Sequence, residues 1–262
     1  MRIYILTMDD PVYSIDFCRK LIRQRHHEIV GITLVKFARF NLGKKRSGLE
    51  YAVTLLLIMG PVFFFQNVWK NYSFKIKLMW SRFFSFIHSP SLKAEAEKYS
   101  ISVNETDNPN SEKFLQHLRR IKPDIIFNQC QSIVRKELLS IPSIGVINKH
   151  NALLPKNRGR LTPFWVLKNR EKESGVSIHF VNEGIDSGDI IFQEKFPVAE
   201  NETFKSLVKK NNEIGIKAMI KALDLLTTGN YQLIKNDERF ATYNSVPTLK
   251  DAIQFRLNRI FS

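Results

Sequence analysis

The sequence predicts an α/β fold with a mostly parallel, Rossmann-like sheet flanked by helices. A strand at 2–6, a helix at 14–24 and a strand at 28–35 follow one another, and such a βαβ unit implies parallel strands. The same alternation resumes after Pro90. Apolar residues make up 44% of the 262 residues, enough for a sizeable core. No GxGxxG follows the first strand, which disfavours a dinucleotide site.

The second half of the chain supplies the remaining elements of this predicted sheet. Helical periodicity or composition predicts helices at 91–100, 111–122, 134–141, 164–170 and 203–229. Apolar β-type runs predict strands at 101–107, 124–130, 145–150, 175–181 and 189–198, of which the last two form a hairpin. The long helix ends at Gly229, a common helix-stop residue. We therefore expect one catalytic domain made of 1–35 and 94–229.

Residues 36–93 interrupt the alternation and form a basic, apolar insertion. They hold ten Lys/Arg and one acid, a net charge of +9, and residues 51–69 carry no charge. Gly60-Pro61 disfavours a membrane span, although the length would barely suffice. Besides a membrane span, two interpretations of this insertion remain open. The helices lie at a membrane interface, or they pack against the protein itself or against a second copy in a homodimer.

The bulk charge and the cysteines bear on partners and compartment. The net charge of +15 indicates an anionic partner, which could be nucleic acid, a phosphorylated small molecule or a membrane surface. Cys18 and Cys130 form neither a disulfide framework nor a metal cluster, which is typical of a reducing compartment. The N-terminus lacks a secretory signal pattern, so we expect a cytoplasmic protein. Residues 230–262 form a short extension with an amphipathic helix at 247–260, whose place in the fold stays open.

The predicted strand 145–150 carries two polar side chains at its carboxyl end. Asn148 and His150 are two residues apart, so both point to the same side of the strand. An amide can stabilise an oxyanion, and an imidazole can move a proton near neutral pH. The plainer alternative is a turn-forming or surface pair, which is common at strand ends.

Two loops after this strand carry further charged residues. Lys156, Arg158 and Arg160 follow Pro155 and could hold phosphate, unless they form a merely solvated basic loop. Asp186 lies in a Gly/Asp-rich loop between the hairpin strands and could orient a histidine. A plain hairpin turn is the alternative, and the ligand alternation of an EF-hand is absent.

The segment NKHNALLPKNRG, followed fifteen residues later by GVSIHFVNEGIDSGDII, resembles the folate-dependent formyltransferase family. The family includes methionyl-tRNA, glycinamide ribonucleotide and sugar N-formyltransferases. The resemblance rests on Asn148 and His150, on the Leu-Leu-Pro loop ending at Gly159, and on Asp186. It is clear over 121–198 and weaker over 1–35 and 203–229.

The resemblance implies formyl transfer from 10-formyltetrahydrofolate to an amine through a tetrahedral intermediate. Asn148 and His150 would hold the oxyanion, while Asp186 would orient His150 and assist proton transfer. No metal is expected. The folate would lie against 128–133 and 181–186, which assigns to it Asn128, Gln129, Cys130, Gln131, Ser132, Ile133, Val181, Gly184 and Ile185. The histidine on the hairpin strand, His179, is expected to be structural.

The acceptor implied by the resemblance is an amino sugar. The run RLTPFWVLKNREKESGVSIHF is most similar to the sugar-modifying branch of polysaccharide biosynthesis. The short tail after 229 disfavours tRNA or other nucleic acid, and TMDDPVYS disfavours glycinamide ribonucleotide. The sugar would be nucleotide-linked or lipid-linked, in the latter case with the enzyme at the inner face of the membrane. Another amine acceptor such as methionyl-tRNA, or a folate-binding protein without turnover, remains the alternative.

Overall fold

A computed structural model describes the chain except residues 13, 25–26, 37–46, 85, 131 and 261–262. Its central sheet has seven strands in the order β3-β2-β1-β4-β5-β7-β8. β7 runs antiparallel to β5 and β8, and every other neighbouring pair is parallel. The predicted mostly parallel sheet and its hairpin are therefore confirmed. The strands are β1 (Arg2–Thr7), β2 (Glu28–Val35), β3 (Val103–Thr106), β4 (Ile125–Asn128), β5 (Gly145–His150), β7 (Glu173–Phe180) and β8 (Ile190–Pro197).

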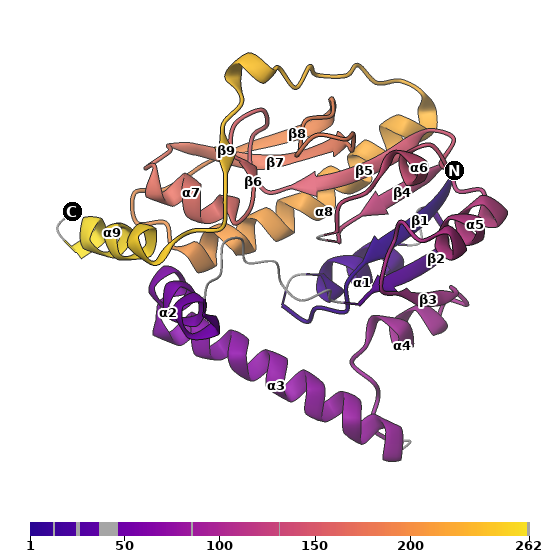
Figure 1. The fold of residues 1–262 in the computed structure, drawn as a ribbon, viewed down its shortest axis with the longest axis horizontal. Coiled ribbons are helices and arrows are strands. Elements are labelled where there is room, and N and C mark those ends of the chain that lie inside the picture. The colour runs from indigo at the N-terminus through magenta and orange to yellow at the C-terminus, as the bar shows by residue number, and fades with distance from the viewer. Residues whose placement is uncertain (13, 25–26, 37–46, 85, 131, 261–262) are drawn as a thin grey trace.

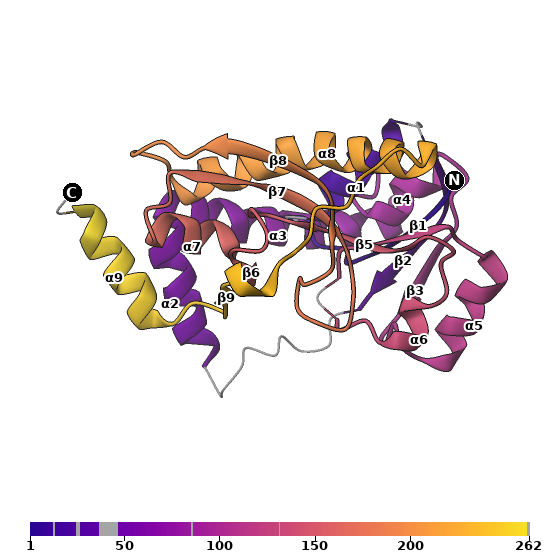
Figure 2. The ribbon, with the colours of Figure 1, turned by 90° about the horizontal axis from the view of Figure 1, so that it is seen from above.

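Helices cover both faces of this sheet (Figures 1 and 2). Alternate strand residues pack on α1 (Ile15–Arg23), α4 (Leu92–Glu97) and α8 (Phe204–Thr228) on one face. The other alternate set packs on α5 (Glu112–Ile121) and α6 (Lys136–Leu139). This division follows from the period-two geometry of strands, in which successive side chains point to opposite faces.

The order of the strands creates a ligand-binding crevice. From β1 the chain builds outward to β2 and β3, and then returns to add β4 and β5 on the other side of β1. Connections from neighbouring strands therefore diverge between β1 and β4, and ligands bind at the carboxyl ends of strands at such switch points. Residues that follow β1, β4 and β5 are consequently placed around one crevice.

The apolar insertion folds into two helices, α2 (Gly48–Met59) and α3 (Pro61–Phe83). They meet at Gly60, whose φ of +77° suits glycine, and Pro61 takes the first position of α3, where its missing N–H costs nothing. Ile58 of α2 packs in a small core with Phe164 and Phe255. Among the described residues, every helix is too short or too polar to cross a bilayer.

The C-terminal extension crosses the molecule before it ends in a helix. Its strand β9 (Tyr243–Asn244) pairs with β6 (Arg158–Gly159) in a separate two-stranded sheet. Its helix α9 (Leu249–Ile260) lies beside α2 and α7 (Thr162–Lys168), with the rings of Phe255 and Phe164 5.3 Å apart. The extension therefore runs from the edge of the strand-end loops to the helical insertion (Figure 1).

One charged side chain is buried on the face of β5 opposite the crevice. Lys149 Nζ lies 4.8 Å from the ring centroid of Phe17 and donates to Asn151 Oδ1 at 3.0 Å. Gly215 of α8 makes room for it, because a Cβ at 215 would lie 2.8 Å from Lys149 Cδ. Burial lowers the pKa of Lys149 from 10.5 to about 8, because the ammonium loses its hydration.

We expect Lys149→Met to raise the free energy of unfolding at pH 7. The downward pKa change corresponds to roughly 3 kcal/mol against the charged form, partly offset because Asn151 loses its donor. The folded-state pKa lies below the unfolded one, so the unfolded chain binds more protons between these values. The penalty is therefore complete below about pH 8 and disappears above pH 10.5. Thermal unfolding across this range measures it.

Lys209→Met is the matched control, because this lysine of α8 has a side chain that is 75% exposed. A gain for Lys149→Met that does not shrink as the pH rises would contradict the explanation by charge burial.

Candidate functional site

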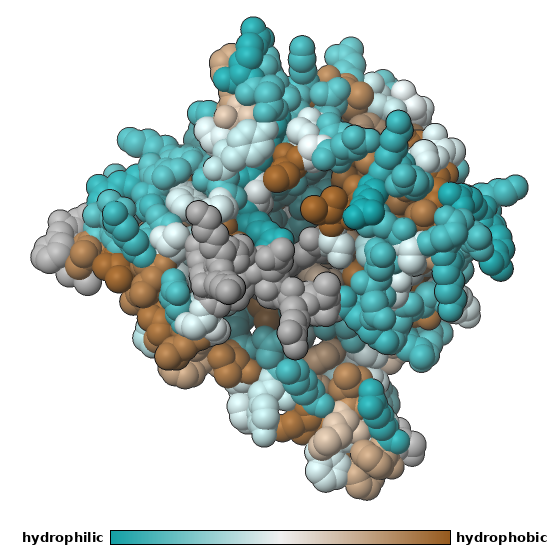
Figure 3. Space-filling model, in the orientation of Figure 1, coloured by the Kyte–Doolittle hydropathy of each residue, from teal (hydrophilic) through white to brown (hydrophobic). Residues whose placement is uncertain are grey.

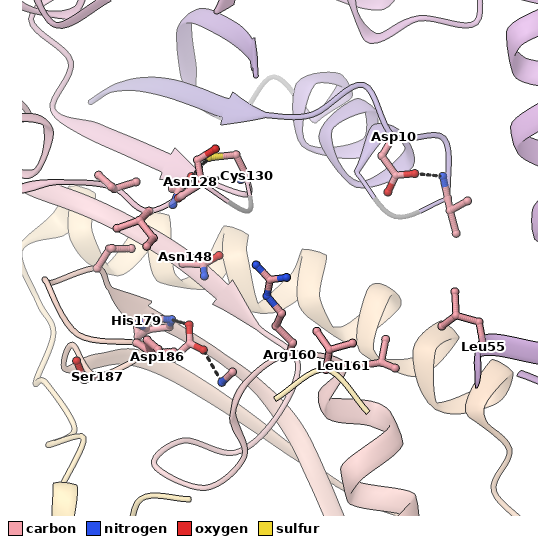
Figure 4. A pocket seen from close by; sticks show the side chains of 18 of the residues that line it. Asp10, Leu55, Asn128, Cys130, Asn148, Arg160, Leu161, His179, Asp186 and Ser187 are labelled. Carbon is pink, nitrogen blue, oxygen red and sulfur yellow. Dashed lines mark hydrogen bonds and ion pairs between the residues drawn. The ribbon is translucent and has the colours of Figure 1, made fainter. Parts of the chain in front are cut away.

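A cavity of about 890 Å³ opens at the carboxyl ends of β1, β4 and β5 (Figure 4). Asn148 of β5, His179 of β7 and the Asp186 loop form one wall. Asp10, which follows β1, lies on another side and is held by the Val12 N–H at 3.0 Å. The helical insertion closes the far side with seven residues: Tyr51, Leu55, Met59, Phe64, Asn67, Val68 and Asn71.

The first predicted site residue, Asn148, faces this cavity. It pairs directly across the sheet with His179, so the two side chains emerge on the same face. The amide points into the open space in Figure 4. Within the described part of the chain it has no hydrogen-bond partner, which leaves its N–H groups for a ligand.

The carboxylate of Asp186 is fixed on several sides. The Gly159 N–H donates to its Oδ2 at 2.8 Å. The backbone of Asp186 has a φ of +46°, and Asn236 of the extension donates to its carbonyl oxygen and to that of Gly188, both at 2.8 Å. Gly159 is required here, because its φ is +100° and a Cβ would lie 2.1 Å from the carbonyl oxygen of Asn244.

Two buried imidazoles face this carboxylate. His150 Nδ1 lies 3.4 Å from Oδ2 of Asp186, and His179 Nε2 lies 3.7 Å from Oδ1. The other ring nitrogens lie 2.8 Å from the Asn157 carbonyl and 2.7 Å from the Phe180 carbonyl. Since carbonyls only accept, those nitrogens carry hydrogen, and we assign both tautomers on this ground.

With these tautomers, Nε2 of His179 and the carboxylate of Asp186 are two neighbouring proton acceptors. Burial lowers the pKa of His179 to about 4, although the carboxylate of Asp186 opposes this effect. The ring is therefore neutral near pH 7, and its Nε2 lone pair faces Oδ1 of Asp186. A proton on one of these atoms could be shared with the other only after their 3.7 Å separation shortens to hydrogen-bond distance. This arrangement lies on the cavity wall and suits a reaction that releases a proton there.

The predicted catalytic residues Asn148, His150 and Asp186 thus lie together, but in different positions relative to the cavity. Asn148 and Asp186 line it, whereas His150 is 6% exposed behind Asp186. Both ring nitrogens of His150 already face protein acceptors. While its hydrogen bond to the Asn157 carbonyl is intact, the His150 ring can affect a ligand in the cavity only through Asp186.

The three basic residues proposed for substrate binding separate in the structure. Arg160 lines the cavity and points into it in Figure 4. Lys156 is exposed and lies outside the cavity wall. Arg158 is fully buried, and its guanidinium is taken up by the extension, which gives it a structural role. It donates to Asn236 Oδ1 at 2.8 Å, to the Tyr243 hydroxyl at 2.6 Å and to the carboxylate of Glu238.

Most of the predicted folate-binding residues lie along one side of the cavity. Seven of them line it: Asn128, Cys130, Ser132, Ile133, Val181, Gly184 and Ile185. Gln129 faces away and accepts from the Cys18 thiol at 3.8 Å, and Gln131 lies outside the described residues. Burial raises the pKa of the Cys130 thiol to about 11, so this cysteine is a wall residue and not a nucleophile.

Three contributions to the site were not expected from the sequence. His179 was expected to be structural, and although it is buried and hydrogen-bonded, it also meets Asp186. Alternation along β7 shows only which residues share the face of His179, and the pairing with β5 that sets it opposite Asn148 depends on the fold. The insertion and Asn236 of the extension gave no local signal, because only the fold brings them to the cavity. Among the described residues, His, Cys, Asp and Glu form no group of three that could hold a metal ion.

Comparison with known proteins bears on these residues. A family model described as "Formyl transferase" matches residues 88–223, which contain Asn148, His150 and Asp186. A methionyl-tRNA formyltransferase of Kosmotoga olearia is 33% identical over 163 residues, 62% of this chain and 52% of the relative. The bifunctional polymyxin resistance protein ArnA of Wigglesworthia glossinidia brevipalpis is 35% identical over 154 residues, 58% of this chain and 24% of the relative.

The fold is also similar to that of solved structures. An N-formyltransferase from Helicobacter canadensis, solved with folinic acid and dTDP-3-aminofucose, has a TM-score of 0.61 at 19% identity. The match covers 99% of this chain and 82% of that one. The chain spans about half the length of the methionyl-tRNA formyltransferases it matches.

We expect Asn236→Ala to lower the free energy of unfolding by on the order of 2–4 kcal/mol. The substitution removes the side-chain donor to the carbonyls of Asp186 and Gly188. It also removes the shorter of the two hydrogen bonds from Arg158 Nη2 to residue 236. Thermal unfolding measures the change. Leu233→Ala is the control, because Leu233 is 46% exposed in the same extension. Equal stability of the two variants would show that Asn236 does not hold the loop.

Proposed function

This chain belongs to the formyl transferase family, and on that premise we propose that it transfers a formyl group from 10-formyltetrahydrofolate to the amine of an amino sugar. The observation that carries the proposal is the free Asn148 amide beside the Asp186–His179 pair, inside one cavity. An acyl-type transfer needs a donor for the developing oxyanion and an acceptor for the amine proton. The two groups supply these two needs a short distance apart.

The cavity suits a folate on the side of β4 and β7. A pterin is a flat ring with polar edges, so it requires apolar walls and a few hydrogen-bonding groups. Val134, Val181, Ile133 and Ile185 supply the walls, and the amide of Asn128 lies at the end of β4 among them. When bound there, the folate supplies the formyl group. Arg160 and the insertion remain for the acceptor on the opposite side.

In this proposal Asn148 donates its amide N–H to the formyl oxygen as negative charge develops on it. Asp186, with His179 Nε2 beside its Oδ1, accepts the proton that the attacking amine loses. The proton then passes to the folate nitrogen as the bond between that nitrogen and the formyl carbon breaks. His150 is a positioning residue in this geometry. Its Nδ1 lies 3.4 Å from the second oxygen of Asp186, so the ring helps to fix where that carboxylate lies.

The amino sugar as acceptor rests on one cavity residue, Arg160, and on one of the similar solved structures. Arg160 extends into the acceptor side and could pair with a sugar-linked phosphate, as guanidinium groups do well. The Helicobacter canadensis enzyme was solved with an amino sugar nucleotide, dTDP-3-aminofucose. Methionyl-tRNA is the second candidate acceptor, because most of the similar curated proteins are methionyl-tRNA formyltransferases.

The acceptor is tested by following tetrahydrofolate release from 10-formyltetrahydrofolate with different amines. We expect release with one or more nucleotide-linked or lipid-linked amino sugars and none with methionyl-tRNA. Arg160→Ala should raise KM for the phosphate-bearing acceptor with a smaller effect on kcat, because it touches the acceptor away from the formyl group. Lys156→Ala, which removes a charge outside the cavity, is the matched control. Release with methionyl-tRNA alone would overturn the sugar proposal.

The roles at the reacting centre are tested by single substitutions. Asn148→Ala should lower kcat by on the order of 10²–10³ with little change in folate affinity, since it removes an oxyanion donor. Asp186→Asn should lower kcat comparably. His150→Gln should lower kcat less than Asp186→Asn does and leave folate affinity unchanged, because the ring acts through Asp186. Unchanged turnover of Asn148→Ala despite normal folate binding would contradict the mechanism.

A further inference from the structure

The outward face of α3 is apolar along most of its length. Six of its exposed large side chains are spaced three, four or seven residues apart and therefore lie in one row, which we call the α3 stripe. The opposite face turns inward, where Phe63 packs on Phe204 and Phe74 packs on the main core. The α3 stripe consists of Val62, Phe65, Trp69, Tyr72, Met79 and Phe83.

The stripe is exposed rather than covered by another part of the described chain. Phe83 is 76% exposed, Trp69 67% and Phe65 61%, and α3 has no buried residue over its 23 positions. Figure 3 shows hydrophobic surface gathered over α2 and the first turns of α3. A contiguous apolar row of this kind on an exposed helix is characteristic of a binding surface.

Cations border the stripe and acids are missing from it. Residues 61–83 contain Lys70, Lys75, Lys77 and Arg82 and no Asp or Glu. At 100° per residue, Lys75 and Arg82 fall on one flank of the stripe and Lys70 and Lys77 on the other. Lys70 pairs with Asp16 at 3.0 Å. The helix thus presents apolar and aromatic side chains between two basic edges, the arrangement of helices that lie in a membrane interface.

The charges decide between a bilayer and a second copy of the chain. If two stripes packed together, their basic flanks would meet, and α3 offers no carboxylate to separate them. An anionic lipid surface would instead neutralise both flanks at once. Tyr and Trp side chains, which the stripe contains, are the residues that favour the headgroup level.

We propose that α3 binds the surface of an anionic bilayer, with the α3 stripe inserted at the boundary between headgroups and acyl chains. The helix then lies parallel to the membrane and does not cross it. Phe64, Asn67 and Asn71 of the same helix line the cavity from the inside. Docking therefore places the cavity one helix away from the lipid, where it could receive an acceptor carried by a lipid. The binding itself does not depend on the proposed transfer reaction.

Flotation of the full chain with vesicles tests the proposal. We expect the protein to float with vesicles of phosphatidylcholine and phosphatidylglycerol, and to stay behind with phosphatidylcholine alone at moderate salt. Trp69→Ser with Phe83→Ser should reduce the bound fraction at least about tenfold. Lys75→Glu with Arg82→Glu should abolish the preference for anionic vesicles.

The control is Phe240→Ser, which removes a ring that is 63% exposed far from α3 in the sequence. It should float like the unchanged protein, and thermal unfolding should show that all variants fold. Failure of the unchanged chain to float with anionic vesicles would overturn the proposal. So would a stable dimer in solution that Trp69→Ser with Phe83→Ser dissociates, because a second copy would then occupy the stripe.

Discussion

The carboxylate of Asp186, which is only 15% exposed, is the constraint around which the site is organised. A charge in that position requires compensation, because its desolvation is costly. The Gly159 N–H provides it on one oxygen, and an imidazole from a different strand lies beside each oxygen. Each of these groups must be held in place by something else. The pairing of β5 with β7 holds both histidines, and the pairing of β6 with β9 holds Gly159.

The fold and the strand-end part of the site could be predicted because both depend on local periodicity. The βαβ pattern predicted a parallel sheet, and the spacing of Asn148 and His150 predicted a common face. The same rule does not say how far each side chain reaches toward solvent. Asn148 reaches the cavity, while His150 is covered by Asp186 and bonded to Asn157.

The rest could not be predicted because it depends on contacts between distant parts of the chain. Arg158 was a reasonable phosphate ligand by residue type, but Asn236 and Tyr243 lie about eighty positions away and use its guanidinium. The residues of α2 and α3 that wall the cavity have no pattern that marks them as such. Their charge and aromatic content could only suggest that they meet something outside the protein or within it.

The course of the C-terminal extension limits how such a chain can be recombined during evolution. Gly229 ends the long helix and looks like a natural boundary, since everything needed for the sheet precedes it. The segment beyond it nevertheless completes the surroundings of Asp186 and Arg158. A gene exchange at this boundary would bring in a foreign extension, and only one with an amide at the place of Asn236 would fit both partners. Inheritance of the catalytic region is therefore linked to that of its terminal segment.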